Sequence, residues 1–128
     1  MVNIISEWMV EASSHTCGAW PPHVDEFEKS GLTPLASHVV KPPRVEEAAF
    51  HMECKFYSKN EIFNDKGEHT STIVLGRVVR FHVVEPLLEE GAHGVPILDT
   101  LGLKPCGRLG GDRWTNLGKT FDIKRPVV

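Results

Sequence analysis

The longest alternation of apolar and polar residues runs over residues 72–84 and predicts a β-strand. One face of this strand is apolar and is interrupted by Arg77, whereas the opposite face carries Gly76 and His82. A glycine inside a strand often marks the close approach of a ligand or of another backbone, and His82 lies on the same face. This face is therefore a candidate site, although the pattern alone favours a half-buried strand with one surface histidine. The apolar face holds Ile73, Leu75, Val79, Phe81 and Val83.

A second alternation, over residues 49–57, predicts a strand with one buried and one solvent-facing side. Asn64, Asp65, Lys66 and Gly67 form a turn signal between the two strands. Together these patterns predict an antiparallel hairpin or meander over residues 49–84. The expected buried side carries Phe50, Met52, Cys54 and Phe56, and the expected wet side carries His51, Glu53, Lys55 and Tyr57.

The rest of the chain predicts short elements. Ser6 is expected to cap a helix that reaches Ala12, and residues 25–30 predict a second helix ended by Gly31. Pro34 limits any strand over residues 32–40 to a short or edge strand. Further expected elements are an extended connector over residues 41–44, a helical turn over 87–90, a helix over 95–103 and a strand over 121–123. The sum predicts a mainly β fold with short helices, in the form of a barrel or a sandwich.

Composition restricts the class of protein. The chain has 128 residues, which suits a single domain over residues 1–128, with 41% hydrophobic and 24% charged residues. Its net charge of −3 argues against nucleic acid or an anionic membrane as the main partner. There is no apolar run long enough to predict a transmembrane helix, and the first residues lack the pattern of a signal peptide. Three widely spaced cysteines favour free thiols, so we expect a cytoplasmic protein.

No single set of reactive residues decides the function. The histidines and cysteines lack zinc-ligand spacings, so no metal site is expected, and His15 beside Cys17 lacks an orienting third group for a nucleophilic pair. Residues 108–111 offer a guanidinium and backbone N–H groups that suit an anion, but they also suit a connecting turn. Trp114 either stacks on a flat ligand or closes the end of a barrel. Lys41 and Arg44 either place two cations at a site or lie on a solvated linker.

Several segments in combination resemble the flavin reductase-like family, whose members have an FMN-binding split-barrel fold. The order and spacing of these segments match along the whole chain. They are VNIISEW at residues 2–8, DEFEKSGLTP at 25–34, Ser37 followed by VKPPRV at 40–45, MECK at 52–55, VLGRVV at 74–79 followed by His82, and RLGG at 108–111.

The resemblance implies a Greek-key split β-barrel, a homodimer, and FMN bound between the barrel and the partner subunit. It implies a flavoprotein oxidoreductase that uses NAD(P)H and acts on a small-molecule substrate, with redox chemistry supplied by the flavin. His82 is the implied catalytic residue, on the nicotinamide or substrate side of the flavin. The implied cofactor-binding residues are Asn3, Ser37, Lys41, Arg44, Gly76, Arg108, Gly110, Gly111 and Trp114.

The start of the chain departs from the family pattern. Family members have a long segment before the strand that ends in VNII, so we expect a partial, N-terminally truncated domain without the first barrel strands. Two alternatives to the flavin enzyme follow. One is a non-redox descendant that serves as a small-molecule-binding or dimerisation domain. The other is a non-redox enzyme in which His82 acts as acid or base, since histidine titrates near neutral pH.

Overall fold

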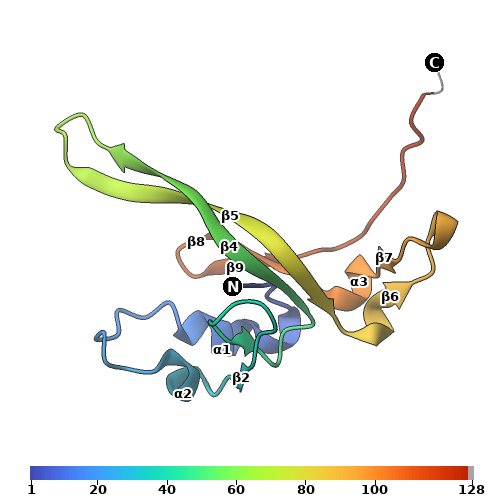
Figure 1. The fold of residues 1–128 in the computed structure, drawn as a ribbon, viewed down its shortest axis with the longest axis horizontal. Coiled ribbons are helices and arrows are strands. Elements are labelled where there is room, and N and C mark those ends of the chain that lie inside the picture. The colour runs from blue at the N-terminus through green and yellow to red at the C-terminus, as the bar shows by residue number, and fades with distance from the viewer. Residues whose placement is uncertain (127–128) are drawn as a thin grey trace.

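The predicted hairpin is the largest feature of the computed structural model, which describes residues 1–126 (Figure 1). Strands β4 (Phe50–Phe63) and β5 (His69–Val83) pair antiparallel, and His51 lies opposite His82. A turn joins them, in which Asn64 Oδ1 accepts hydrogen bonds from the N–H groups of Lys66 and Glu68. The prediction is confirmed, but both strands are longer than expected because their ladder continues through residues 58–63 and 69–71 without an apolar alternation. Strand β1 (Val2–Asn3) extends the sheet along β4.

The expected burial of β4 is wrong. His51 and Glu53 are buried, at 4% and 0% exposure, whereas Phe56 is 68% exposed. The polar side is covered because residues 36–45 fold over it and supply hydrogen bonds, while residues 1–126 leave much of the apolar side uncovered. Register shifts after Glu53 and Phe56 also interrupt the alternation from which a single buried face was predicted.

Short helices precede this sheet: η1 (Glu7–Met9), α1 (Val10–His15) and α2 (Glu26–Ser30). The second predicted helix is confirmed, since Asp25 accepts from Phe27 N at 2.9 Å and Gly31 ends the helix at φ 71°. The first continues past Ala12, and Ser6 does not cap it through its side chain, because its Oγ is buried without a hydrogen-bond partner. Two short strands follow, β2 (Pro34–Leu35) and β3 (Arg44–Val45), so Arg44 belongs to a strand rather than to an extended connector.

The C-terminal part differs most from the sequence prediction. The expected helical turn ends at Leu87, the helix expected over residues 95–103 begins only at Thr100, and residues 121–123 form no strand. Pairing between β6 and β7, rather than intrinsic propensity, determines the conformation of residues 88–98, and residues 121–123 have no partner strand. The elements are η2 (Glu85–Leu87), β6 (Leu88–Glu89), η3 (Ala92–Gly94), β7 (Ile97–Leu98), α3 (Thr100–Leu103), β8 (Cys106–Gly110) and β9 (Arg113–Asn116).

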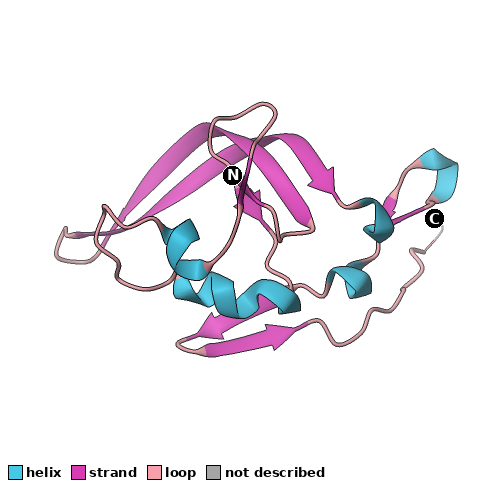
Figure 2. Cartoon of the chain, turned by 90° about the horizontal axis from the view of Figure 1, so that it is seen from below, coloured by secondary structure: helices cyan, strands magenta, loops and turns pink. Residues whose placement is uncertain are grey.

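The elements form layers around a small interior. Figure 2 shows the N-terminal helices lying between the long β4–β5 hairpin and the β8–β9 hairpin. The fully buried apolar side chains are few, and charged groups share the interior with them. No helix within residues 1–126 is both long and apolar enough to span a membrane. The buried apolar residues are Met9, Ala48, Ala49 and Leu103, and the buried polar ones are Ser6, Ser13, Arg44, His51 and Glu53.

Candidate functional site

A buried carboxylate lies beneath His82 and organises the surrounding residues. Glu53 Oε1 accepts a hydrogen bond from His38 N at 2.9 Å and lies 2.6 Å from His82 Nε2. Glu53 Oε2 accepts from Val39 N at 2.6 Å and from Val40 N at 2.9 Å. One side chain of β4 therefore holds both the loop over residues 38–40 and the histidine of β5.

These contacts fix the protonation of the pair. Burial by itself raises the pKa of the Glu53 carboxyl, but the hydrogen bonds from His38 N, from His82 and from Val39 and Val40 outweigh it and lower the pKa to about 2. At neutral pH Glu53 is consequently an anion that can only accept hydrogen bonds. His82 must then carry a proton on Nε2 and donate it to Glu53.

A pocket of about 400 Å³ opens beside His82. Two further imidazoles lie near it: the ring centroid of His38 is 5.0 Å from that of His82, and the ring centroid of His51 is 6.1 Å away. Arg44 and Arg80 also line the pocket, and neither forms an ion pair with a described carboxylate. The remaining lining residues are Leu35, Glu46, Ala48, Phe81, Val83 and Val84.

His51 forms the inner wall of this pocket in an uncharged state. Its Nε2 lies 2.8 Å from the carbonyl oxygen of Val45 and therefore donates to it, whereas its Nδ1 is buried with no partner within residues 1–126. Burial is the main cause that lowers the pKa of His51, and the neighbouring Arg44 and His82 lower it further, against the opposing bond to Val45.

Four of the predicted cofactor-binding residues lie at or near this pocket. Arg44 is buried, at 8% exposure, and donates from Nε and Nη2 to the carbonyl oxygen of Ala36 at 3.3 and 3.0 Å. Ser37 Oγ donates to the carbonyl oxygen of Pro42 at 2.5 Å and so closes the loop that contacts Glu53. Lys41 lies exposed on that loop, and Asn3 Oδ1 accepts from the N–H of Val45 on β3 at 3.1 Å.

Gly76 lies six residues before His82 on β5 and does not line this pocket. The predicted shared face is wrong, because the strand register shifts between Glu53 and Cys54 and turns Gly76 to the opposite side of the hairpin. A Cβ atom at this position would lie 3.2 Å from Cys54 Cβ on the paired strand. The close approach predicted from this glycine is therefore made by the neighbouring strand of the hairpin. A structural requirement is enough to explain the glycine.

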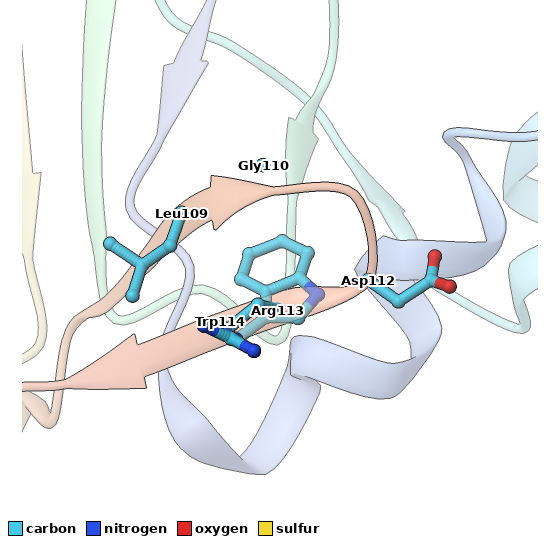
Figure 3. Close-up of a pocket in the computed structure, with 5 residues that line it drawn as sticks. All are labelled: Leu109, Gly110, Asp112, Arg113 and Trp114. Carbon is cyan, nitrogen blue, oxygen red and sulfur yellow. The ribbon is translucent and has the colours of Figure 1, made fainter.

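The remaining predicted residues lie together in a second place, the β8–β9 hairpin. Gly110 and Gly111 have positive φ, 98° and 54°, where β8 ends and the turn to β9 begins. Arg108 donates from Nε and Nη2 to the carbonyl oxygen of Gly111 at 3.1 and 2.7 Å, and its guanidinium lies 5.3 Å from the centroid of the Trp114 ring. Figure 3 shows the Trp114 indole over this hairpin, among the residues that line a pocket there. This pocket shares no lining residue with the His82 pocket.

Sequence reasoning missed Glu53, His38 and His51 as site residues. Their alternation with apolar neighbours predicts a solvent-facing side for both Glu53 and His51. A usable signal was present: a carboxylate and two histidines occupy adjacent strands of one predicted hairpin, on the side that carries His82. Within residues 1–126, no three histidine, cysteine or acidic side chains are placed to hold a metal ion, and the three cysteines are free thiols.

The model of the protein family described as "Flavin reductase like domain" matches residues 1–100 of this chain. The chain belongs to the flavin reductase-like family. It is 33% identical over its whole length to an uncharacterized protein of Halalkalibacterium halodurans, covering 59% of that protein, and 32% identical to one of Bacillus subtilis. The match to the Bacillus subtilis protein covers 98% of this chain and 60% of that protein.

Solved structures show the same fold. Nitrilotriacetate monooxygenase component B from Bacillus cereus superposes with a TM-score of 0.85 at 36% identity, covering 95% of this chain and 58% of that one. A split barrel domain protein of Shewanella frigidimarina superposes with a TM-score of 0.80 at 18% identity, covering 97% of this chain and 59% of that one. The predicted split-barrel fold class is thus confirmed. The chain spans about three fifths of the length of these proteins.

Proposed function

We propose that this chain is part of a flavin-dependent oxidoreductase that binds FMN and accepts electrons from NAD(P)H, with a small organic molecule as a further substrate. Membership in the flavin reductase-like family supports the flavin. The single observation that carries the site is the His82–Glu53 pair at the edge of the 400 Å³ pocket. A buried carboxylate that orients a histidine beside a cavity is an arrangement suited to proton transfer. A cytoplasmic location remains a prediction.

The residues of this pocket fit part of an FMN-like ligand. Arg44 is a buried cation whose described partner is the neutral carbonyl of Ala36, and buried charges are usually compensated. Arg80 adds a second positive charge on β5, and the imidazoles of His38 and His82 offer flat surfaces. A phosphate or a carboxylate together with a planar ring would complement this lining.

The proposed roles follow from these positions. Bound flavin would supply the hydride and electron transfer. His82 would hold or move a proton through Nδ1, since its Nε2 is bonded to Glu53. Arg80 would bind the anionic end of a ligand, and the loop over residues 37–42, which Ser37 closes and Lys41 flanks, would exclude water from one side. Arg108, Gly110, Gly111 and Trp114 would form a separate contact, with the indole stacking on a ring of the cofactor or of a nucleotide.

A second candidate function, dimerisation, has its own support. The β4–β5 hairpin exposes large apolar side chains on the face opposite the His82 pocket, among them Phe56, Val74, Val78 and Phe81. Contiguous exposed apolar surface of this kind marks contact sites. We propose that a homodimer covers part of this face. A non-redox descendant would keep this contact and lose the flavin.

Titration of the full chain with FMN, followed by flavin fluorescence, separates these functions. Saturable quenching of the FMN fluorescence, followed by reduction of the bound FMN when NAD(P)H is added, supports the oxidoreductase. A parallel titration with FAD tests the preference for FMN. Replacement His82→Ala is expected to lower the rate of flavin reduction more than it lowers FMN affinity. Absence of saturable FMN binding by a folded chain would remove the flavin function and leave the dimerisation domain.

A further inference from the structure

Each carboxylate oxygen of Glu53 accepts two hydrogen bonds. Oε1 meets His82 Nε2 and His38 N, and Oε2 meets Val39 N and Val40 N. Three of the four donors are backbone N–H groups, which cannot change their protonation. His82 is the only one of the four that can adapt, because a neutral imidazole carries its proton on either nitrogen.

We propose that Glu53 is a positioning residue that fixes His82 as the Nε2–H tautomer and thereby presents Nδ1 as the nitrogen available to a ligand in the pocket. Within residues 1–126 no group forms a hydrogen bond to Nδ1 of His82. The side chain of His82 keeps 15% of its surface exposed, whereas Glu53 is fully enclosed beneath it. The reactive nitrogen is therefore set by a side chain that does not itself line the pocket.

The same carboxylate links this tautomer to the loop over residues 38–40. The backbone N–H groups of His38, Val39 and Val40 all find their acceptor on the fully buried carboxylate of Glu53. His38 also places its ring 5.0 Å from that of His82, so the loop forms one wall around the histidine. Glu53 consequently determines both the position of this wall and the nitrogen that His82 offers. The inference of a ligand at Nδ1 rests on the proposed function, but the tautomer does not.

Replacement Glu53→Gln tests this role because it exchanges one acceptor oxygen for an NH2 donor. If the new NH2 group faced Val39 and Val40, two backbone N–H groups would lose their acceptor. If it faces His38 and His82 instead, only the N–H of His38 is left unpaired, since His82 can accept on Nε2 after its proton moves to Nδ1. The second arrangement leaves fewer backbone donors without an acceptor, so the variant is expected to switch His82 to the Nδ1–H tautomer.

Long-range 1H–15N NMR of the imidazole rings, recorded on the full chain without flavin at mildly alkaline pH, measures the tautomer directly. We expect Nε2–H as the major tautomer of His82 in the wild type and Nδ1–H in the Glu53→Gln variant. Glu46→Gln is the matched control, because Glu46 lines the same pocket without a side-chain hydrogen bond to His82. It should leave the His82 tautomer as in the wild type.

A wild-type His82 that is mainly the Nδ1–H tautomer would overturn the proposal, and this result does not require that any variant folds. A folded Glu53→Gln variant that keeps Nε2–H on His82 would also overturn it, since Glu53 would then only support the loop. Because these spectra need no cofactor, failure of FMN binding would refute the proposed function and leave this inference intact.

Discussion

Arg44 is the buried cation of the pocket, and replacement Arg44→Met tests whether it supports the fold. Methionine keeps most of the apolar stem but removes both hydrogen bonds to the carbonyl oxygen of Ala36. Hydrogen bonds that involve a charged group contribute about 1.5–3 kcal/mol, and relief of an unpaired buried charge offsets part of that loss. We expect the free energy of unfolding to fall by about 1–2 kcal/mol, because lost bonds outweigh the relieved desolvation.

Urea denaturation of the wild type, of Arg44→Met and of Lys41→Met measures this difference. Lys41 is the matched control, since it is an exposed cation three residues earlier on the same segment. The Arg44 variant should also raise the pKa of His51. Burial is the main cause that lowers this pKa, but the charge of Arg44 lowers it further, and the substitution removes that charge. NMR titration of His51 reports that shift. Equal stability of the two variants, together with an unchanged pKa of His51, would refute the structural role of Arg44.

Three further predictions concern acid stability, Gly76 and the apolar hairpin. The folded-state pKa of Glu53, about 2, lies below its ordinary value of 4.5, so the unfolded chain binds more protons in acid and stability should fall as the pH drops from 4.5 toward 2. The pKa of His51 is also lowered in the folded state, so stability should begin to fall once the pH drops below the ordinary histidine pKa of 6.5. A flat profile of urea midpoints over both pH ranges would contradict these contacts. Gly76→Val should lower the free energy of unfolding by about 1–3 kcal/mol in urea denaturation, because the new Cβ would lie 3.2 Å from Cys54 Cβ. Gly107→Val is the control, since its nearest atom is a side-chain methyl at 3.4 Å, and an equal loss of stability in both variants would refute this prediction. Phe56→Lys should weaken self-association in sedimentation at unchanged monomer stability, and an unaltered dimer would exclude this residue from the interface.

The long hairpin could be predicted from sequence because several signals agree along it. β-branched residues, alternation and an Asn–Asp–Lys–Gly turn all indicate the same pairing of β4 with β5. The helix after Asp25 was likewise predictable from its cap and from Gly31. The β8–β9 hairpin was not predicted, since it is short and glycine-rich and its pairing depends on a turn with two positive-φ glycines.

The candidate site could be predicted only in part. His82 was identifiable from the family resemblance, and it does lie at a pocket. The face that it was predicted to share with Gly76 is wrong, because the register shift between Glu53 and Cys54 turns Gly76 to the opposite face of the hairpin. The role of Glu53 was not identifiable, because the alternation of polar and apolar residues predicts that a glutamate between Met52 and Cys54 faces solvent. Its burial depends on three backbone N–H groups of a loop that lies 13 to 15 residues earlier in the chain. Long-range contacts of that kind leave no periodic signal in the sequence.

We propose that the pocket beside His82, which Glu53 and the loop over residues 38–40 support, faces the flavin. The most direct test is an NMR titration of the labelled full chain with FMN that follows the ring signals of His38 and His82 and the amide signals of residues 38–40. We predict saturable shifts of these signals, with His23 and His93, which lie outside the pocket, unaffected. Saturable FMN binding that leaves the His38 and His82 signals in place would contradict the account.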